Sequence, residues 1–347
     1  MVGSSQQESF ARIVADVAAE MLAIRRDQTT IASLFWEVVD YQFGWDLDDP
    51  AETQRVSGKK IRPLLMALVA QAISGDYQHV LPAGAALEFL HNFTLIHDDV
   101  MDNSVERRHR PAAWTHWGKY QAINVGDGMY ALANVAIARL LENATPPRKV
   151  ALAFRIMSQA CLWTAEGQIL DMDFETRDRV SPDEYITMIT NKSATLIEAA
   201  AQIGAVLSTD DDALVERYGR FARYLGIAFQ VRDDYLGVWG DEAQTGKSAT
   251  SDIREKKKSY PVLVGFQRAA GDDLAILQRI YAQDELTDDD IDSVLSILER
   301  VDAVAHTDSI AHDYYTGALN ELDATGINNS TQDLLRQYAE FLIQRWY

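Results

Sequence analysis

Two short runs of aspartate, about 135 residues apart, carry most of the chemical information in this chain. The first is Asp98-Asp99-Val100-Met101-Asp102, and the second begins with Asp233-Asp234. Each follows an apolar stretch that predicts a helix, on which residues three or four apart share a face. Gathered carboxylates repel one another and are costly to desolvate unless a cation joins them. A solvated helix end is the alternative interpretation for either run alone.

The ligand types favour one metal. Neither run has a Cys or His at ligand spacing, so the donors are hard carboxylate oxygens. Such oxygens suit Mg²⁺, which keeps several waters and usually shares its coordination shell with substrate phosphates. The two runs therefore predict Mg²⁺ sites that are completed by a phosphorylated substrate.

Basic residues accompany the aspartates in an otherwise acidic protein. They form three islands, at 59–62, 107–110 and 247–258. Arginine matches the forked geometry of phosphate oxygens, and lysine supplies a mobile point charge. Carboxylates that hold Mg²⁺ beside cations that hold phosphate predict a site for a diphosphate ester.

The composition excludes several classes of protein. With 32 Lys and Arg against 52 Asp and Glu, the formal net charge is −20. This charge argues against nucleic acid and against an anionic membrane surface as partners. No apolar run reaches the ~18 residues of a membrane span. The single cysteine, Cys161, permits no disulfide within the chain and indicates a reducing, cytoplasmic location.

Apolar residues recur at helical spacing along almost the whole chain. Helices are expected at 9–24, 31–41, 61–73, 81–101, 121–141, 150–175, 182–207, 213–238, 260–270, 273–282, 288–299, 301–321 and 331–346. Alternating strand patterns with turn dipeptides are missing, and no break is long enough for an interdomain linker. Residues 1–347 are therefore predicted to form a single all-α domain, a helical bundle whose central helices face their acidic ends toward one cavity.

From Gly58 to Pro261 the sequence resembles the trans-isoprenyl diphosphate synthases, also called polyprenyl synthetases. The matching segments, in family order, are 58–63, 91–102, 107–108, 122–127, 166–171, 192–193, 229–234, 246–247 and 257. The resemblance implies an all-α isoprenoid synthase fold with a central active-site cavity, and a homodimer. It also implies head-to-tail condensation of isopentenyl diphosphate with an allylic diphosphate (dimethylallyl, geranyl or farnesyl), assisted by Mg²⁺.

The resemblance assigns roles to individual residues. The Mg²⁺ ligands would be Asp98, Asp102 and Asp233, with Asp99 and Asp234 as further ligands or as partners of the ligands. The allylic diphosphate would be held by Arg107, Lys192, Lys247 and Lys257, and isopentenyl diphosphate by Lys59, Arg62, His91 and Arg108. Ser193 and Gln230 would face the carbocation as dipoles. Any of the lysines at 256–258 could be merely solvated, and the family register favours Lys257.

A few positions depart from the family pattern. Gly237 stands where many relatives have a third aspartate, which removes one carboxylate from the predicted metal face. Asp241 could compensate only if the helix continues past Gly240, and glycine commonly ends a helix. His109 replaces a common glycine after the arginine pair. None of these changes removes a residue type that the chemistry requires.

Product length is predicted from the residues that precede Asp98. Thr94 and Phe93 lie four and five positions earlier, at ~6 and ~7.5 Å along a helix. A small residue at the fourth position and an aromatic only at the fifth resemble the geranylgeranyl diphosphate type. The twenty-carbon product is therefore predicted, with farnesyl diphosphate as the alternative. The pocket floor could instead be formed by Leu90, Met129 or Tyr130.

Two other functions use similar motifs. A class I terpene cyclase carries similar acidic runs but holds no second diphosphate, and it has no use for Lys59, Arg62 and Arg108. A noncatalytic subunit of a heteromeric synthase usually loses the first motif, which is intact here. An active chain-elongating prenyltransferase is therefore the main hypothesis.

Overall fold

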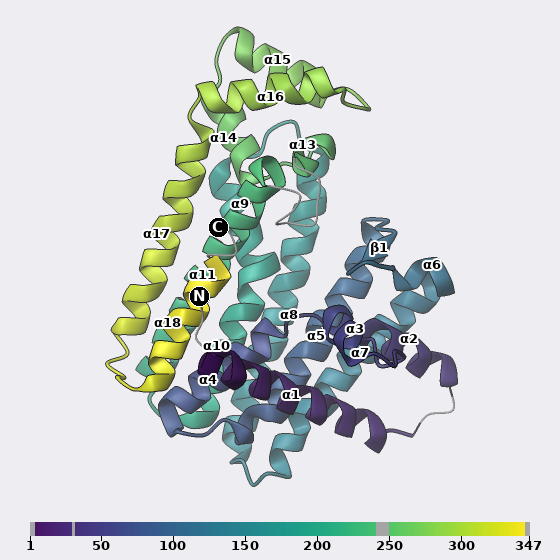
Figure 1. Cartoon of the computed structure of the whole chain (residues 1–347), viewed down its shortest axis with the longest axis vertical. Helices are drawn as coiled ribbons and strands as arrows, with labels where there is room; N and C mark the ends of the chain where they lie inside the picture. The colour runs from purple at the N-terminus through teal and green to yellow at the C-terminus, as the bar shows by residue number, and fades with distance from the viewer. Residues whose placement is uncertain (1–3, 30–31, 241–249, 344–347) are drawn as a thin grey trace. The chain divides into compact units, whose positions relative to one another are not determined.

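A computed structural model describes residues 4–29, 32–240 and 250–343, with side chains from residue 8 onward. These residues are mostly helical (Figure 1). They divide into two compact units, and each is described by itself. Unit 1 comprises Met1–Cys161, Ala199–Glu216 and Ile327–Leu335, and unit 2 comprises Leu162–Glu198, Arg217–Gly326 and Arg336–Tyr347. The prediction of a single domain stays a prediction.

Unit 1 is built around one long apolar helix, α5 (Leu81–Met101), which has the predicted bounds. Its first half is buried on all sides, as expected for a helix that is apolar all round. It packs mainly against α7, α4 and α1. The helices that belong wholly to this unit are α1 (Ser4–Asp27), α2 (Ser33–Phe43), α3 (Pro50–Ser57), α4 (Ile61–Ser74), α5, α6 (Ala113–Trp117) and α7 (Lys119–Ala138).

Four helices contribute residues to both units. They are α8 (Pro147–Thr176), α10 (Thr195–Ser208), α11 (Asp212–Trp239) and α18 (Ser330–Ile343). The predicted helix at 213–238 corresponds to α11, which ends before Gly240 as its sequence indicates. No helix among the described residues is long and apolar enough to cross a membrane.

Unit 2 contains two hydrophobic clusters. In one, buried residues of α15 and α16, including Ile280 and Val294, pack against Val264 of α14. In the other, Tyr185 and Met188 of α9 pack against Val231 of α11. The helices that belong wholly to this unit are α9 (Pro182–Ile189), α13 (Ser251–Arg254), α14 (Tyr260–Arg268), α15 (Asp272–Tyr281), α16 (Asp288–Arg300) and α17 (Ala303–Asp323).

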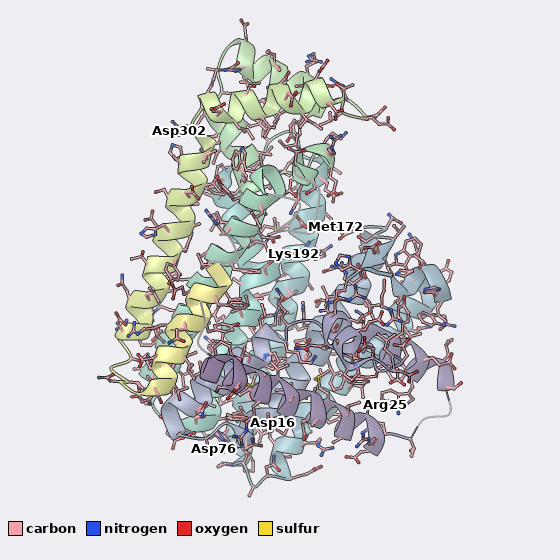
Figure 2. The ribbon with its side chains drawn as sticks, viewed as in Figure 1. Asp16, Arg25, Asp76, Met172, Lys192 and Asp302 are labelled. Atoms are coloured by element: carbon pink, nitrogen blue, oxygen red, sulfur yellow. The ribbon has the colours of Figure 1, made fainter. Side chains whose placement is uncertain are left out.

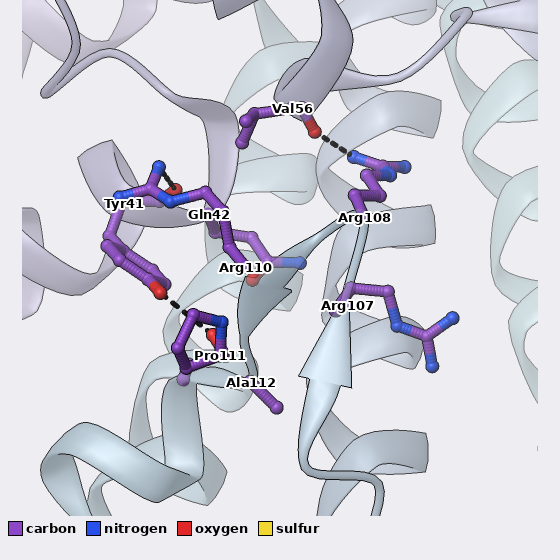
Figure 3. Close-up of a pocket in the computed structure, with 9 residues that line it drawn as sticks. Tyr41, Gln42, Val56, Arg107, Arg108, Arg110, Pro111 and Ala112 are labelled. Carbon is purple, nitrogen blue, oxygen red and sulfur yellow. Dashed lines mark hydrogen bonds between the residues drawn. The ribbon is translucent and has the colours of Figure 1, made fainter. Parts of the chain in front are cut away.

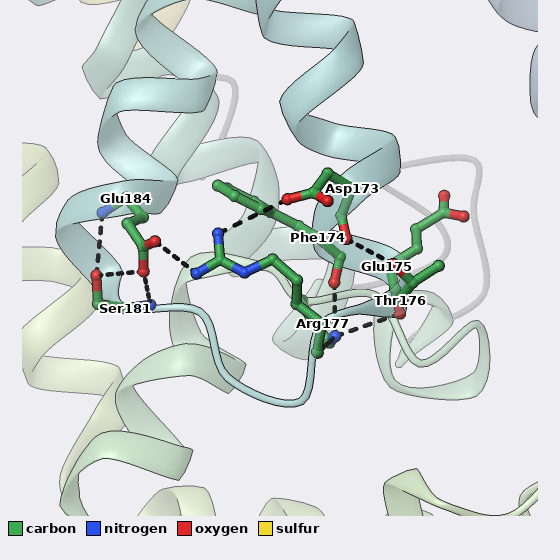
Figure 4. Close-up of polar contacts among 8 residues, drawn as sticks. Asp173, Phe174, Glu175, Thr176, Arg177, Ser181 and Glu184 are labelled. Carbon is green, nitrogen blue, oxygen red and sulfur yellow. Dashed lines mark hydrogen bonds and ion pairs between the residues drawn. The ribbon is translucent and has the colours of Figure 1, made fainter.

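Helix α9 begins where the sequence predicts, with Ser181 as its N-cap and Pro182 in its first turn. The Ser181 hydroxyl accepts a hydrogen bond from the backbone N–H of Glu184 at 3.2 Å, and the Glu184 carboxylate accepts one from the N–H of Ser181 at 2.9 Å. Arg177 donates to the same carboxylate at 2.7 Å (Figure 4). These contacts lower the pKa of Glu184 to about 2, with the backbone hydrogen bond as the largest cause.

Three short helices, α3, α6 and α13, lie where the sequence predicts none, and two other expectations are wrong in detail. The predicted helix at 182–207 is not continuous, because a π-helical turn, Thr190–Ala194, separates α9 from α10. The expected absence of strands also fails, because β1 (Glu106–Arg107) pairs with β2 (Arg110–Pro111) in a short antiparallel hairpin. Both departures contain residues that the sequence assigns to diphosphate binding.

Candidate active site

The first aspartate run lies at the C-terminal end of α5. Asp98 and Asp99 belong to its last turn, and Asp102 follows the helix, with its N–H bonded to the carbonyl of Asp98 at 2.8 Å. The C-terminal end of a helix carries partial negative charge, so carboxylates are unfavourable there without a cation. Asp98 is partly exposed and Asp102 is exposed, whereas only 2% of Asp99 is exposed. The run therefore presents Asp98 and Asp102 to solvent and keeps Asp99 inside.

Asp99 is held by Arg107 of the hairpin. The guanidinium of Arg107 donates to Oδ1 of Asp99 from Nε, at 2.9 Å, and also from Nη2. Burial raises the pKa of Asp99, and the charge and hydrogen bonds of Arg107 oppose that rise. Asp99 therefore fixes the position of Arg107 relative to the helix end, while its own oxygens have little access to solvent.

The turn of the hairpin separates the two arginines. Arg108 and His109 form a two-residue turn with φ of 54° and 61°. Two-residue hairpin turns of this kind require positive φ and favour Asn or Gly, which explains why glycine is common at the position of His109. Arg107 extends to Asp99, whereas Nη1 of Arg108 donates to the carbonyl of Val56 at 2.8 Å. The arginine pair therefore acts at two different places in unit 1.

Arg108 lies directly against Gly58. Figure 3 shows Arg108 with its hydrogen bond to the carbonyl of Val56. Gly58 has φ of 76°, and a Cβ on it would lie 2.7 Å from Nη2 of Arg108. Both observations require glycine at this position. Arg107, Arg108 and Arg110 line one small pocket beside α2 and Val56. Arg110 has a structural role there, because it pairs with Asp46 at 2.8 Å and its guanidinium lies 3.7 Å above the Tyr41 ring.

The pKa of His91 depends on the positive charges of three arginines. Burial and the positive charges of Arg62, Arg108 and Arg107 together lower the pKa of His91 well below its ordinary value. Burial also lowers the pKa of Lys60, whose ammonium donates to the Ser57 hydroxyl at 2.8 Å. The neighbouring Lys59 is exposed. The predicted isopentenyl diphosphate residues Lys59, Arg62, His91 and Arg108 thus all belong to unit 1, where the charges of Arg62 and Arg108 act on His91.

The second aspartate run lies near the end of α11 in unit 2. Asp233 is exposed, whereas Asp234 is completely buried. Asp234 accepts hydrogen bonds from the Tyr185 hydroxyl and from the backbone N–H of Tyr260, the latter at 3.0 Å. Burial raises the pKa of Asp234 to about 6, against the opposing charge of Lys257. The division between an exposed and a buried carboxylate is the same as in the first run.

The predicted carbocation-facing residues are linked to Asp234. The Ser193 hydroxyl donates to Oε1 of Gln230 at 3.0 Å, and Nε2 of Gln230 donates to Oδ1 of Asp234 at 3.4 Å. This chain of contacts fixes the orientation of the Gln230 amide. One side-chain dipole is therefore held in place by the carboxylate behind it.

Lys192 and Ser193 lie on the π-helical turn, and Figure 2 labels Lys192. The Lys192 ammonium pairs with Asp171 of α8. A Cβ on Gly167 would lie 2.3 Å from the backbone nitrogen of Lys192, so α8 approaches the turn closely only because position 167 is glycine. A π-helical turn re-aims the side chains within a helix and often occurs at functional sites.

The three lysines at 256–258 have different environments. Lys256 donates to the carbonyl of Gln283 at 2.5 Å, and Lys258 donates to the carbonyl of Phe174 at 2.6 Å. Lys257 instead lies 3.7 Å from a carboxylate oxygen of Asp234 and 3.7 Å from one of Asp252. Burial alone would lower the pKa of Lys257, but these carboxylates and Asp233 raise it above its ordinary value.

Two predicted residues lie outside the described part of the chain, namely Lys247 and Asp241.

The predicted product-length residues lie on α5. The Phe93 ring is 5.6 Å from the Tyr130 ring of α7, and the Thr94 hydroxyl donates to the carbonyl of His91 at 2.8 Å. The alternative floor residues Leu90 and Met129 are fully buried.

The carboxylates present fit Mg²⁺ in chemical type. Within the described residues, no three His, Cys, Asp or Glu side chains gather closely enough to hold a metal ion by themselves. Mg²⁺ is commonly bound by one or two carboxylates together with waters and substrate phosphates. The partly exposed Asp98 and exposed Asp102 and Asp233 match that mode, whereas the buried Asp99 and Asp234 match supporting residues.

Residues 47–298 match the family model for polyprenyl synthetase, which covers well over half of the chain. The chain belongs to the polyprenyl synthetase family. It is accordingly a prenyltransferase, and the main hypothesis from the sequence is confirmed at this level. The all-α isoprenoid synthase fold is likewise confirmed.

The chain is similar to individual family members along most of their length. The chain is 35% identical to the geranylgeranyl diphosphate synthase of Methanosarcina mazei over 84% of this chain and 86% of that protein. It is 33% identical to the (2E,6E)-farnesyl diphosphate synthase of Mycobacterium tuberculosis over 89% of this chain and 85% of that protein. The crystal structure of polyprenyl synthetase from Streptomyces coelicolor A3(2) superposes with a TM-score of 0.85 at 31% identity, and covers 96% of this chain and 98% of that one.

Three residues that surround Asp234 and Lys257 are not predicted from the sequence. Tyr185 and Tyr260 bind Asp234, and Asp252 lies beside Lys257. Tyr185 belongs to an amphipathic helix and resembles any core aromatic, so no signal marks it. Asp252 and Tyr260 lie within five residues of Lys257, and their only signal was this proximity.

Proposed function

We propose that this prenyltransferase condenses isopentenyl diphosphate head to tail with allylic diphosphates, and that geranylgeranyl diphosphate is its main product. The observation that carries this proposal is the arrangement in unit 1. There the aspartate run at the end of α5 is paired through Asp99 with Arg107 of the hairpin, and Arg108 follows in the same hairpin. Arg107 and Arg108 extend to different places, which supports separate binding of two diphosphates. A terpene cyclase has only one diphosphate to bind.

The chemistry requires charge stabilisation rather than a protein nucleophile. The allylic C–O bond breaks, its electron pair leaves with the diphosphate, and the π bond of isopentenyl diphosphate attacks the resulting carbocation. A proton is then lost to the released diphosphate, which restores the double bond. Bound Mg²⁺ would supply positive charge to the leaving diphosphate. Asp98, Asp102 and Asp233 are proposed to hold it, supported by Asp99 and Asp234.

The cationic side chains divide between the two substrates in this proposal. Arg107, Lys192, Lys247 and Lys257 bind the allylic diphosphate, and Lys59, Arg62, His91 and Arg108 bind isopentenyl diphosphate. The lowered pKa of His91 supports the second set, because a neutral imidazole among arginines can gain a proton when a dianion arrives. Ser193 and Gln230 face the carbocation, and Asp234 orients the Gln230 amide.

The product is set in this proposal by the floor at Phe93. The Thr94 hydroxyl is occupied by its own helix, which leaves a small methyl surface for a prenyl tail to pass. One residue deeper along α5, the Phe93 ring is braced by the Tyr130 ring. Farnesyl diphosphate remains the alternative product, and relatives with both product names have similar identity to this chain.

We also propose a homodimer, formed through α7. Tyr120 is 86% exposed, and Ile123 and Val135 are 39% and 40% exposed. On a helix these three side chains fall within an arc of about 120°. Exposed apolar residues clustered on one helix face indicate a protein–protein interface. A Tyr120→Glu variant should form monomers in light scattering, and a wild-type monomer at micromolar concentration would contradict the proposal.

The function is tested by incubating the purified chain with isopentenyl diphosphate, Mg²⁺ and each allylic diphosphate in turn. Chromatography of the dephosphorylated products should show a twenty-carbon alcohol, and EDTA should abolish it. Hydrocarbon formed without isopentenyl diphosphate would indicate a cyclase. The absence of elongation with every primer would contradict the proposal and favour a noncatalytic subunit.

A further inference from the structure

Gly237, the departure in the second aspartate run, is in close contact with a carboxylate from another element. A Cβ on Gly237 would lie 2.3 Å from Cγ of Asp252 and 2.4 and 2.5 Å from its two oxygens. Such distances are far below van der Waals contact. The carboxylate of Asp252, on α13, therefore fills the space that a side chain at position 237 of α11 would need.

Asp252 is an unusual residue at this place. Only 5% of it is exposed, and within the described part of the chain its Oδ2 has no hydrogen-bond partner. A buried carboxylate oxygen without a partner is costly, so its retention calls for a nearby cation. Lys257 meets this need, because its ammonium lies 3.7 Å from Oδ2 of Asp252. The backbone N–H of Lys257 also donates to the carbonyl of Asp252 at 2.8 Å.

The two contacts of the Lys257 ammonium are equal in length. It lies 3.7 Å from Asp234 on one side and 3.7 Å from Asp252 on the other. These distances are too long for hydrogen bonds, so neither carboxylate takes up an ammonium proton. The side chain is 42% exposed. Lys257 is therefore centred by two charges, and among the described residues no acceptor takes up its ammonium protons, which can bind an incoming phosphate.

We propose that Asp252 supplies the third carboxylate of the second aspartate cluster, in the space left by glycine at position 237, and that it is the positioning residue for the Lys257 ammonium. The inference rests on the proposed role of Lys257 in binding the allylic diphosphate. Gly237 and Asp252 form a matched pair, so a substitution at one changes what the other can do.

The test measures KM for the allylic diphosphate and for isopentenyl diphosphate separately. Asp252→Asn keeps the shape and removes the charge, and it should raise the allylic KM about tenfold while the isopentenyl KM stays unchanged. Gly237→Ala should have the same effect, because the methyl group displaces the carboxylate. Alanine has a higher helix propensity than glycine, so a higher allylic KM in this variant cannot be attributed to a weaker α11. Asp273→Asn, which breaks an ion pair with Arg300 in the same unit, is the control and should change neither KM.

A double-mutant cycle separates positioning from packing. In a Lys257→Ala background, Asp252→Asn should add less than a twofold effect, because the residue it positions is gone. Full additivity, or an unchanged allylic KM in both Asp252→Asn and Gly237→Ala, would overturn the inference. The double variant Gly237→Asp with Asp252→Gly should recover most of the activity lost in Gly237→Asp, and no recovery would count against the matched pair.

The Lys257→Ala variant distinguishes this inference from the proposed function. If Lys257→Ala leaves the allylic KM unchanged, the proposed role of Lys257 is wrong. If Lys257→Ala raises the allylic KM and Asp252→Asn does not, only the role of Asp252 is wrong. Should Asp252→Asn fail to fold by circular dichroism, Gly237→Ala carries the test, because it moves the carboxylate without removing it.

Discussion

Arg107 donates to one oxygen of Asp99 from both Nε, at 2.9 Å, and Nη2, which fixes the hairpin to the end of α5. Asp99 is almost completely buried, and about two thirds of the Arg107 side chain is buried as well. The second carboxylate of the first run therefore orients an arginine rather than facing solvent. Asp234 repeats this arrangement in unit 2, with Tyr185 and the Tyr260 backbone as its donors.

Removal of the Asp99 charge should affect stability as well as activity. Asp99→Asn leaves the Arg107 guanidinium with a weaker acceptor, which should lower the free energy of unfolding by about 1–3 kcal/mol. The measurement is the shift in Tm by calorimetry beside the turnover number. Asp98→Asn should reduce turnover without a comparable fall in Tm, and the exposed Asp313→Asn should change neither. Equal Tm values for Asp99→Asn and Asp98→Asn would contradict this division.

The pKa of His91 should rise when a diphosphate binds. In the free protein, burial and three arginines hold it well below 6.5. A bound dianion neutralises the arginines and favours the imidazolium, so NMR titration with inorganic pyrophosphate should show a pKa increase of about one unit or more. A His91 pKa that stays constant under saturation would remove His91 from the diphosphate site.

The lowered pKa of His91 in the free protein also predicts a pH dependence of stability. The unfolded chain binds a proton at His91 near pH 6.5, whereas the folded chain does not. Stability from this group is therefore complete above about pH 6.5 and is lost as pH falls below it. His91→Gln should weaken the fall in Tm between pH 7 and pH 5. An identical slope in the wild type and the variant would contradict the assignment.

Glu184 should show its effect at lower pH. Its pKa is lowered from 4.5 to about 2 by Ser181 and Arg177. The contribution of its charge to stability is therefore present above pH 4.5 and is lost as pH falls toward 2. Glu184→Gln should lower Tm slightly at pH 6, and the difference from the wild type should narrow as the pH approaches 2. A constant difference across this range would show that the charge has no part in the cap.

Replacement of Phe93 should change the product. Phe93→Ala removes the proposed floor and should shift the main product from twenty to twenty-five or more carbons, measured by chromatography. Leu95→Ala is the control, because its side chain lies about 200° around the same helix. If Tyr130→Ala lengthens the product and Phe93→Ala does not, the floor belongs to α7.

The helices could largely be predicted, because their apolar periodicity is local. Helix α5 has the expected bounds, since its apolar run starts beside Pro82 and ends at the aspartates. The π-helical turn could not be predicted, because it depends on close packing of Gly167 against the backbone at Lys192. The hairpin was missed for a different reason, since Arg108-His109 lacks the Asn-Gly signature of its turn.

The residues of the candidate site likewise divide into those that the sequence predicts and those that it does not. Exposed ligands such as Asp98 and Asp233 follow from a motif in the sequence, because their chemistry depends on residue type and spacing. Their supports do not, because the contacts of Tyr185 and Asp252 arise only from tertiary packing. The groups proposed to bind substrate are therefore marked in the sequence, whereas the groups that hold them are defined only by the folded structure.

The most direct test of the account compares Asp98→Asn, Asp233→Asn and the double variant in turnover at saturating substrates and Mg²⁺. If both carboxylates act on the same ionising diphosphate, each single variant should lose about 10³-fold in turnover. The double variant should then be little worse than the poorer single one, because groups that act as a unit are not additive. The exposed Asp313→Asn should retain full turnover. Near-normal turnover in either single variant, or losses that multiply in the double variant, would contradict the account.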